Sequence, residues 1–378
     1  MKYFLLLILC SVAFSTLNAQ HVESEIPYRL VGGKMIIDMK MNGQMRSFIF
    51  DTGGQTSLTQ EVCQELGLPD YAPIQITDVN GQKGSYERVL IEELVDVNTL
   101  FAFRKVPAIV IPAPSPFECF HVDGLIGSDI LKSFIIEIDG KKKIIKLIST
   151  TKNVFPSLRK MLPFAQSGFM PIINLQVGAG NSITVLFDTG CPGFLNLKDA
   201  DFEKLRESGA FQIKSIGYSE GSIGLGGMAA TDTSYRVVFP LLSIGPSRFQ
   251  HVSSQTSPHP YTLLGVKLLD YGKVTIDYSR SRFYFELYEE EEVKMNEVYY
   301  PFSLRVKDGD LVVSAIWDKK YSYLSIGDKV TRINGKTVDK FDFCESIING
   351  VPELKHKKTN KLTIQTRGGE KVVLYKKK

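Results

Sequence analysis

Two aspartates in this chain end apolar runs, and each is followed by Thr-Gly. Asp51 lies in "FIFDTGGQTSLT" (48–59), and Asp188 lies in "VLFDTGCPG" (185–193). Burying a carboxylate costs free energy unless the group is hydrogen-bonded, paired or used in chemistry. Because both sites have matching surroundings, they indicate a common cause, and the simplest is a pair of catalytic carboxyl groups.

Such a pair performs acid–base chemistry when its members lie a few ångströms apart. Two adjacent carboxyl groups cannot both ionise cheaply, so they share a proton. One then deprotonates a water molecule held between them, while the other protonates the carbonyl oxygen of a substrate. This chemistry needs no metal ion and no covalent nucleophile. We therefore expect Asp51 and Asp188 to be catalytic, and we expect no metal and no cofactor.

The residues after each aspartate suit a supporting role. Gly53 and Gly190 allow a tight turn that brings backbone N–H groups toward the carboxylate. Thr52 and Thr189 can hydrogen-bond between the two loops and hold them in register. We expect these four residues to support the active-site loops.

The two Asp-Thr-Gly segments belong to a long internal repeat. Gly127 and Gly265, each preceded by two apolar residues, have the same separation in sequence as the two segments, to within one position. The same holds for Asp139 and Asp277. An offset kept this closely over about 100 positions indicates two copies of one design. The apolar-apolar-Gly segments are expected to pack behind the Asp-Thr-Gly loops.

The chain is predicted to be mostly β, because alternating apolar runs are separated by Asn-Gly, Gly-Gly and proline-containing turns. Short helices are expected within "QEVCQELGL" (60–68) and "KDADFEKLRESG" (198–209). The predicted organisation is two pseudo-symmetric β-barrel lobes at 22–150 and 166–290, a linker between them, and a small α/β domain at 298–378.

With "FIFDTG…GLIG" and "VLFDTG…LLG", the chain resembles the retropepsin-like aspartic proteases over both predicted lobes. The resemblance implies an endopeptidase in which each lobe contributes one aspartate, Asp51 and Asp188, and in which glycine-rich flaps close over an extended peptide. The implied flaps are the hairpins near 80–86 and 221–227, with candidate residues Gly81, Gly84, Tyr86, Gly224, Gly226 and Gly227. Lobe two departs from the family pattern, because Cys191 and Pro192 replace the usual hydroxyl residues.

The third unit contains "IGDKVTRINGKTV" (326–338), which resembles the PDZ domain family. The resemblance implies a groove that binds a peptide by β-strand addition, beside a helix near 340–348. The implied peptide-binding residues are Tyr300, Phe302, Ser303 and Leu304, although Pro301 removes one backbone donor from the loop. The alternative is a packing domain without a ligand.

The N-terminus reads as a signal peptide over residues 1–19. Lys2 is followed by an apolar run from Tyr3 to Phe14, and small residues precede Gln20. We therefore expect export, to the periplasm or the outside of the cell, with no membrane span left after cleavage. An uncleaved anchor and a lipid anchor on Cys10 are the alternatives.

Composition narrows the range of partners. A net charge of +4 on 378 residues gives no support to nucleic-acid binding. The cysteines that remain after signal removal fit no zinc pattern and form zero, one or two bridges; they are Cys63, Cys119, Cys191 and Cys344. We expect a monomer, because two complementary lobes on one chain pair at high effective concentration.

Three functions are compatible with these observations. The first is an exported aspartic endopeptidase that cleaves peptides or proteins and whose PDZ-like domain assists substrate recognition. The second is a non-catalytic peptide-binding adaptor that keeps the protease fold. The third, a glycoside hydrolase, fits less well, because its two carboxyl groups usually lie about 5–10 Å apart in unequal surroundings.

Overall fold

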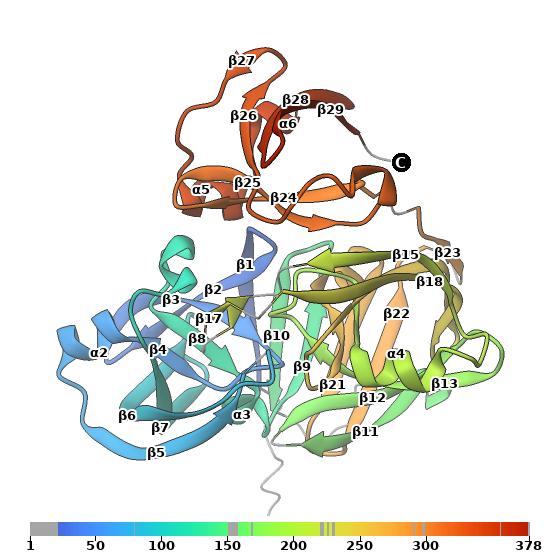
Figure 1. Cartoon of the computed structure of the whole chain (residues 1–378). Coiled ribbons are helices and arrows are strands. Elements are labelled where there is room, and N and C mark those ends of the chain that lie inside the picture. The colour runs from blue at the N-terminus through green and yellow to red at the C-terminus, as the bar shows by residue number, and fades with distance from the viewer. Residues whose placement is uncertain are drawn as a thin grey trace, which may run out of the picture.

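Figure 1 shows the computed structural model of the chain, which describes residues 22–78, 80–149, 158–167, 169–219, 223–224, 227–228, 231–289, 292–296, 299–355 and 357–376. The expected signal peptide, 1–19, lies outside the described residues. The structure is mostly β, as the alternation and turn residues predict. We refer to residues 22–149 as lobe one, residues 158–289 as lobe two and residues 299–376 as the C-terminal unit.

Lobe one contains ten strands and three short helical segments among its described residues. They are β1 (Val22–Val31), β2 (Lys34–Met41), β3 (Gln44–Asp51), β4 (Ser57–Thr59), α2 (Gln60–Leu66), β5 (Asp70–Thr77), β6 (Lys83–Asp96), β7 (Ala102–Ile111), η1 (Pro116–Phe120), β8 (Gly124–Gly127), α3 (Ser128–Leu131), β9 (Ile135–Asp139) and β10 (Ile144–Ser149). The predicted helix after Leu58 is α2, and it ends at Gly67 in the left-handed conformation.

Lobe two repeats most of this order. Its elements are η2 (Leu158–Lys160), β11 (Met161–Ser167), β12 (Met170–Val177), β13 (Asn181–Asp188), β14 (Leu195–Lys198), α4 (Asp199–Leu205), β15 (Gln212–Ser219), β16 (Ile223–Gly224), β17 (Gly227–Met228), β18 (Asp232–Ile244), β19 (Ser247–Ser257), β20 (Thr262–Gly265), η3 (Val266–Asp270), β21 (Gly272–Asp277) and β22 (Arg282–Leu287). We expected the segment 151–165 to be a linker, but its last residues belong to β11. This strand pairs with β12 and β22 and is part of lobe two.

The two lobes share one sheet, in the order β1–β10–β9–β21–β22–β11. At its centre β9 and β21 are antiparallel, and Glu137 pairs with Thr275, which is its own counterpart in the repeat. The pair therefore has an approximate two-fold axis. One continuous core of buried apolar side chains extends through both lobes, so the axis lies inside a single packed body.

Each catalytic candidate lies at the end of a strand that is paired in the same way in both lobes. β3 runs parallel to β8 with Asp51 opposite Gly127, and β13 runs parallel to β20 with Asp188 opposite Gly265. A side chain on either glycine would overlap backbone atoms of the neighbouring loop, such as Gln55 Cα at 2.5 Å from a Cβ on Gly127. Glycine is therefore required behind each Asp-Thr-Gly loop.

The C-terminal unit follows β23 (Glu292–Lys294) and has its own hydrophobic core. Its elements are β24 (Phe302–Lys307), β25 (Asp310–Ile316), η4 (Lys319–Tyr321), β26 (Lys329–Ile333), β27 (Lys336–Thr337), α5 (Phe343–Asn349), α6 (Pro352–Lys355), β28 (Thr359–Thr366) and β29 (Gly369–Lys376). The helix that we expected near 340–348 is α5.

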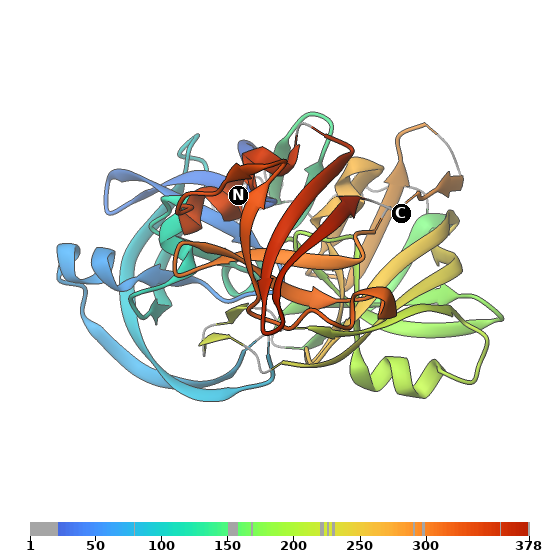
Figure 2. The same cartoon turned by 45° about the horizontal axis from the view of Figure 1, so that its top comes forward.

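Two attachments hold this unit across both lobes, where Figures 1 and 2 show it in orange and red. A disulfide joins Cys344 on α5 to Cys119 on η1 of lobe one. On the other side β25 pairs with β15 of lobe two, with Tyr218 opposite Ile316 and Ser219 opposite Ala315. The sequence left the disulfide pairing open, and it gave no sign of the β15–β25 pairing.

Candidate active site

The two Asp-Thr-Gly loops meet where the lobes join. The carboxyl groups of Asp51 and Asp188 lie within interaction distance of each other. Gly53 N–H donates to Asp51 Oδ1 at 2.8 Å, and Gly190 N–H donates to Asp188 Oδ1 at 2.7 Å. A Cβ on Gly53 would lie 2.6 Å from Asp188 Cγ, so the glycine of each loop lies directly against the carboxyl group of the other.

The threonines of the two loops bind each other in a symmetric arrangement. Thr52 N–H donates to Thr189 Oγ1 at 3.0 Å, and Thr189 N–H donates to Thr52 Oγ1 at 3.1 Å. Each hydroxyl group in turn donates to a backbone carbonyl of the opposite lobe, on Phe187 at 2.7 Å and on Phe50 at 2.8 Å. Both threonines are fully buried, and these four bonds fix the position of one aspartate relative to the other.

The surroundings make Asp51 a weak acid. Burial raises the pKa of Asp51 well above its usual value, and the negative charge of Asp188 raises it further. The ammonium group of Lys34 and the N–H of Gly53 oppose this rise. A carboxyl group with this raised pKa keeps its proton at pH values where an ordinary aspartate is ionised, which is what a shared-proton pair requires.

Lys34 also belongs to the site, although nothing in the sequence marks it as a site residue. It follows the Gly32-Gly33 turn between β1 and β2, and its Nζ donates to the carbonyl oxygen of Gly190. Gly33 lies against Pro192, since a Cβ there would be 2.8 Å from Pro192 Cβ. The two glycines indicated a turn, but no sequence pattern showed that this turn reaches the Asp-Thr-Gly loop of the other lobe.

The two loops are held from behind by different means. In lobe one, Asp129 accepts hydrogen bonds from Thr56 N–H at 2.9 Å and from the Thr56 hydroxyl at 2.8 Å. In lobe two, where no hydroxyl follows the motif and Lys267 stands at the place of Asp129, a backbone bond replaces them: Lys267 N–H donates to Gly193 O at 3.2 Å. The departure seen in the sequence therefore changes how the loop is supported and leaves the carboxyl groups paired.

Cys191 is a free, buried thiol next to the aspartate pair. Burial raises the pKa of Cys191 to about 12, and the charge of Asp188 adds to the effect. Because the thiolate is the reactive form of cysteine, this residue is a poor nucleophile.

The first expected flap is the β5–β6 hairpin. Gly81 lies in its turn with φ of 75°, while Gly84 and Tyr86 lie on β6. A Cβ on Gly81 would lie 3.6 Å from the carbonyl oxygen of Pro258 in lobe two. The tip of this hairpin, which belongs to lobe one, therefore reaches across to the opposite lobe.

The second expected flap lies between β15 and β18. Gly224 on β16 pairs with Gly227 on β17, and Gly226 lies outside the described residues. Its base is the strand β15 that pairs with the C-terminal unit.

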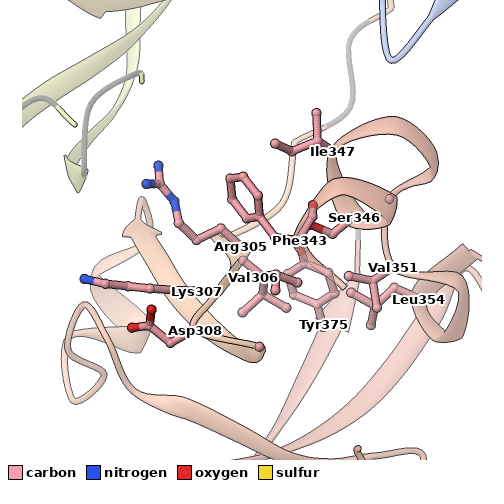
Figure 3. A pocket seen from close by; sticks show the side chains of 13 residues that line it. Arg305, Val306, Lys307, Asp308, Phe343, Ser346, Ile347, Val351, Leu354 and Tyr375 are labelled. Atoms are coloured by element: carbon pink, nitrogen blue, oxygen red, sulfur yellow. The ribbon is translucent and has the colours of Figure 1, made fainter. Parts of the chain in front are cut away.

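The four expected peptide-binding residues of the C-terminal unit have different surroundings. Phe302 is 0% exposed in the core of the unit, and Tyr300 stacks on Tyr375 with ring centroids 4.2 Å apart. The Ser303 hydroxyl accepts a hydrogen bond from Trp317 Nε1 at 3.2 Å. Leu304 lines a groove of about 670 Å³ between β24 and α5, which Figure 3 shows with its apolar side chains.

Among the described residues, no group of three or more His, Cys, Asp or Glu side chains is arranged to hold a metal ion. No helix in the same residues is both long and apolar enough to cross a membrane.

Comparison with known proteins gives a match to a family model and matches to solved structures. Residues 37–130 match the family model of the aspartyl proteases, a stretch that contains Asp51 and Gly127 but not Asp188. A crystal structure of a retropepsin-like aspartic protease from Rickettsia conorii is similar, with 20% identity over 34% of this chain and 93% of that chain, at a TM-score of 0.25. No curated protein matches the chain. The family-model match supports an aspartyl peptidase.

Proposed function

We propose that this protein is an exported aspartic endopeptidase whose catalytic groups are Asp51 and Asp188. The observation that carries the proposal is the adjacent pair of aspartates, held by the reciprocal bonds of Thr52 and Thr189. Two equivalent carboxyl groups on an approximate two-fold axis suit one shared proton and one water molecule. They suit a glycosidase less well, since that mechanism needs carboxyl groups of unlike environment.

The reaction begins with one proton shared by the pair. One aspartate takes a proton from the water molecule between them as the water oxygen attacks the peptide carbonyl carbon, and the other gives the shared proton to the carbonyl oxygen. The product is a neutral tetrahedral diol. A proton then passes to the peptide nitrogen, the C–N bond breaks, and the second hydroxyl proton returns to the pair. The products are a carboxylic acid and an amine, and the dyad regains its single proton.

The other parts of the site prepare this step. The fixed Thr52–Thr189 bonds hold the carboxyl groups at one separation, so little reorganisation accompanies proton transfer. The β5–β6 hairpin, whose tip reaches Pro258, covers the cleft and limits the access of bulk water. We assign it the role of a flap.

The N-terminal pattern supports export, and the disulfide between Cys119 and Cys344 is consistent with it, because such bonds persist in oxidising compartments. We further propose that the groove between β24 and α5 binds a peptide segment by strand addition. Its volume of about 670 Å³ is within the usual range of ligand pockets.

The test is cleavage of a diverse peptide library by purified protein over a range of pH, alongside Asp51→Asn and Asp188→Asn. The proposal predicts cleavage by the wild type and loss of cleavage in either variant. Cleavage that persists in both variants would contradict the assigned pair. If the wild type cuts nothing at any pH but still binds peptides, a non-catalytic peptide-binding protein becomes the better account.

A further inference from the structure

A second cavity, also of about 670 Å³, lies between three parts of the chain that are distant in sequence. One side is the loop after the second catalytic aspartate, Cys191 to Gly193. Another is the tip of the first hairpin, with Asn80 and Gln82. The third is the C-terminal unit, which contributes Arg305 and Trp317 among others.

We infer that this cavity is a distal substrate subsite, and that the C-terminal unit forms one wall of the substrate cleft. In this role Asn196, Ser257 and Arg305 bind a part of the peptide that lies about three residues from the bond that is cut. The inference rests on the proposed function, and it identifies a part of the cleft that determines substrate specificity.

The position of the cavity relative to the aspartate pair supports this role. Cys191 lines the cavity and follows closely after Asp188 in the same loop. An extended chain spans at most about 3.3–3.6 Å per residue, so the cavity begins within about 11 Å of the Asp188 backbone. A substrate in extended form covers this distance in about three residues. The cavity is therefore within reach of a peptide bound at the pair.

Two side chains of the cavity have buried polar atoms without a hydrogen-bond partner. Among the described residues, Asn196 Oδ1 and Ser257 Oγ are side-chain polar atoms buried in this way. Both residues line the cavity. Because a buried polar atom without a partner costs free energy, a bound group that hydrogen-bonds to it would lower that cost. Amide groups of a peptide backbone would supply the bonds.

The wall provided by the C-terminal unit is fixed in place. The Arg236 guanidinium of lobe two lies 4.0 Å from the ring centroid of Trp317 and donates to Tyr300 O at 2.8 Å. Trp317 is 4% exposed and fits against Gly217, where a side chain would overlap its ring. With the β15–β25 pairing and the disulfide, these contacts make the unit part of the cleft instead of a freely tethered domain.

Arg305 is the charged residue that this unit contributes to the cavity. It lies on β24, and Figure 3 shows its guanidinium extending away from the apolar side chains of the other groove. Arg305 lines both the cavity and the groove beside α5, so it can contact a peptide in the cleft without occupying that groove.

The experiment uses a peptide with a known cut site, taken from the library. It is shortened to two residues on each side of the cut and compared with versions lengthened by three residues at either end. We expect the lengthening at one end to raise kcat/KM, and each hydrogen bond gained contributes about three- to tenfold. Asn196→Leu, Ser257→Ala and Arg305→Ala should each lower the ratio of long to short peptide. The control is Lys371→Ala. Lys371 is an exposed residue on β29 that lines neither the cavity nor the groove beside α5.

A second readout separates binding from a structural role. Removing a buried hydroxyl group without a partner does not destabilise the free protein, so Ser257→Ala should keep or raise the melting temperature while lowering the ratio. If short and long peptides are cut equally well, this inference fails and the proposed function stands. If no peptide of the library is cut, the proposed function fails and the inference with it. The inference would also be refuted if all three variants kept the wild-type ratio of kcat/KM between the long and the short peptide.

Discussion

Thr52 and Thr189 bind each other across the boundary between the lobes, although they belong to different copies of the repeat. The N–H of each donates to the hydroxyl oxygen of the other at 3.0 and 3.1 Å. The hydroxyl groups then donate to carbonyl oxygens of the opposite lobe. The register of the aspartate pair therefore depends on both lobes at once.

Removing either hydroxyl group should weaken both stability and activity. Thr52→Ala leaves the Phe187 carbonyl and the Thr189 N–H buried without partners, at a cost of about 1–3 kcal/mol for each group. We expect a loss of about 2–4 kcal/mol in the free energy of unfolding, measured by urea denaturation, and a loss of roughly 100-fold or more in kcat/KM. Thr52→Ser keeps the hydroxyl group and should retain most of both. Equal behaviour of the alanine and serine variants would show that the hydroxyl group is not what matters.

The raised pKa of Asp51 predicts a pH dependence of stability. An unfolded aspartate titrates near pH 3.9. Above this pH and up to the raised pKa, the folded protein holds a proton that the unfolded chain has released, so stability falls as pH rises. Asp51→Asn removes this contribution. The variant should therefore gain stability relative to the wild type as pH rises above about 4, measured by thermal unfolding over a pH series.

The same titration limits activity, because a dyad without its proton has no acid to protonate the substrate. The wild-type kcat should fall as pH rises through the apparent pKa of the pair. Asp70→Asn, on exposed β5, is the control and should follow the wild type in both measurements. A wild-type protein whose stability increases steadily from pH 4 to pH 8 relative to Asp51→Asn would contradict the raised pKa.

The disulfide between Cys119 and Cys344 should stabilise the attachment of the C-terminal unit. Closing a long loop typically contributes about 2–4 kcal/mol. Cys344→Ser, and the wild type in reducing agent, should unfold at lower temperature by calorimetry and expose α5 to faster hydrogen exchange. Cys63→Ser is the control, because it replaces a buried free thiol and keeps the disulfide. Reducing agent should affect this variant as it affects the wild type. The role of the disulfide would be refuted if reduction left the exchange of α5 unchanged.

The local parts of this structure could be predicted from the sequence. The repeat offset and the apolar runs indicated the strands that end at Asp51 and Asp188, and Leu66-Gly67 marked the end of α2. These features follow from periodicity and turn chemistry within a few residues. Met161–Ser167 is different, because its strand forms through pairing with β22, which leaves no local signal.

The contacts made over long distances could not be read in this way. Lys34 reaches Gly190, and Cys119 reaches Cys344, only because the lobes and the C-terminal unit pack as they do. Likewise, Asn196 and Ser257 are ordinary polar residues in the sequence. Their buried atoms without partners become apparent only when the cavity around them is known.

The most direct test of the central claim is a double-mutant cycle on the two aspartates. We would measure kcat/KM for a cleaved peptide with the wild type, Asp51→Asn, Asp188→Asn and the double variant. Groups that act on one water molecule as a unit are strongly non-additive. The account predicts a loss of roughly 1,000-fold or more in each single variant and little further loss in the double variant. Losses under tenfold in either single variant, or losses that multiply in the double variant, would contradict it.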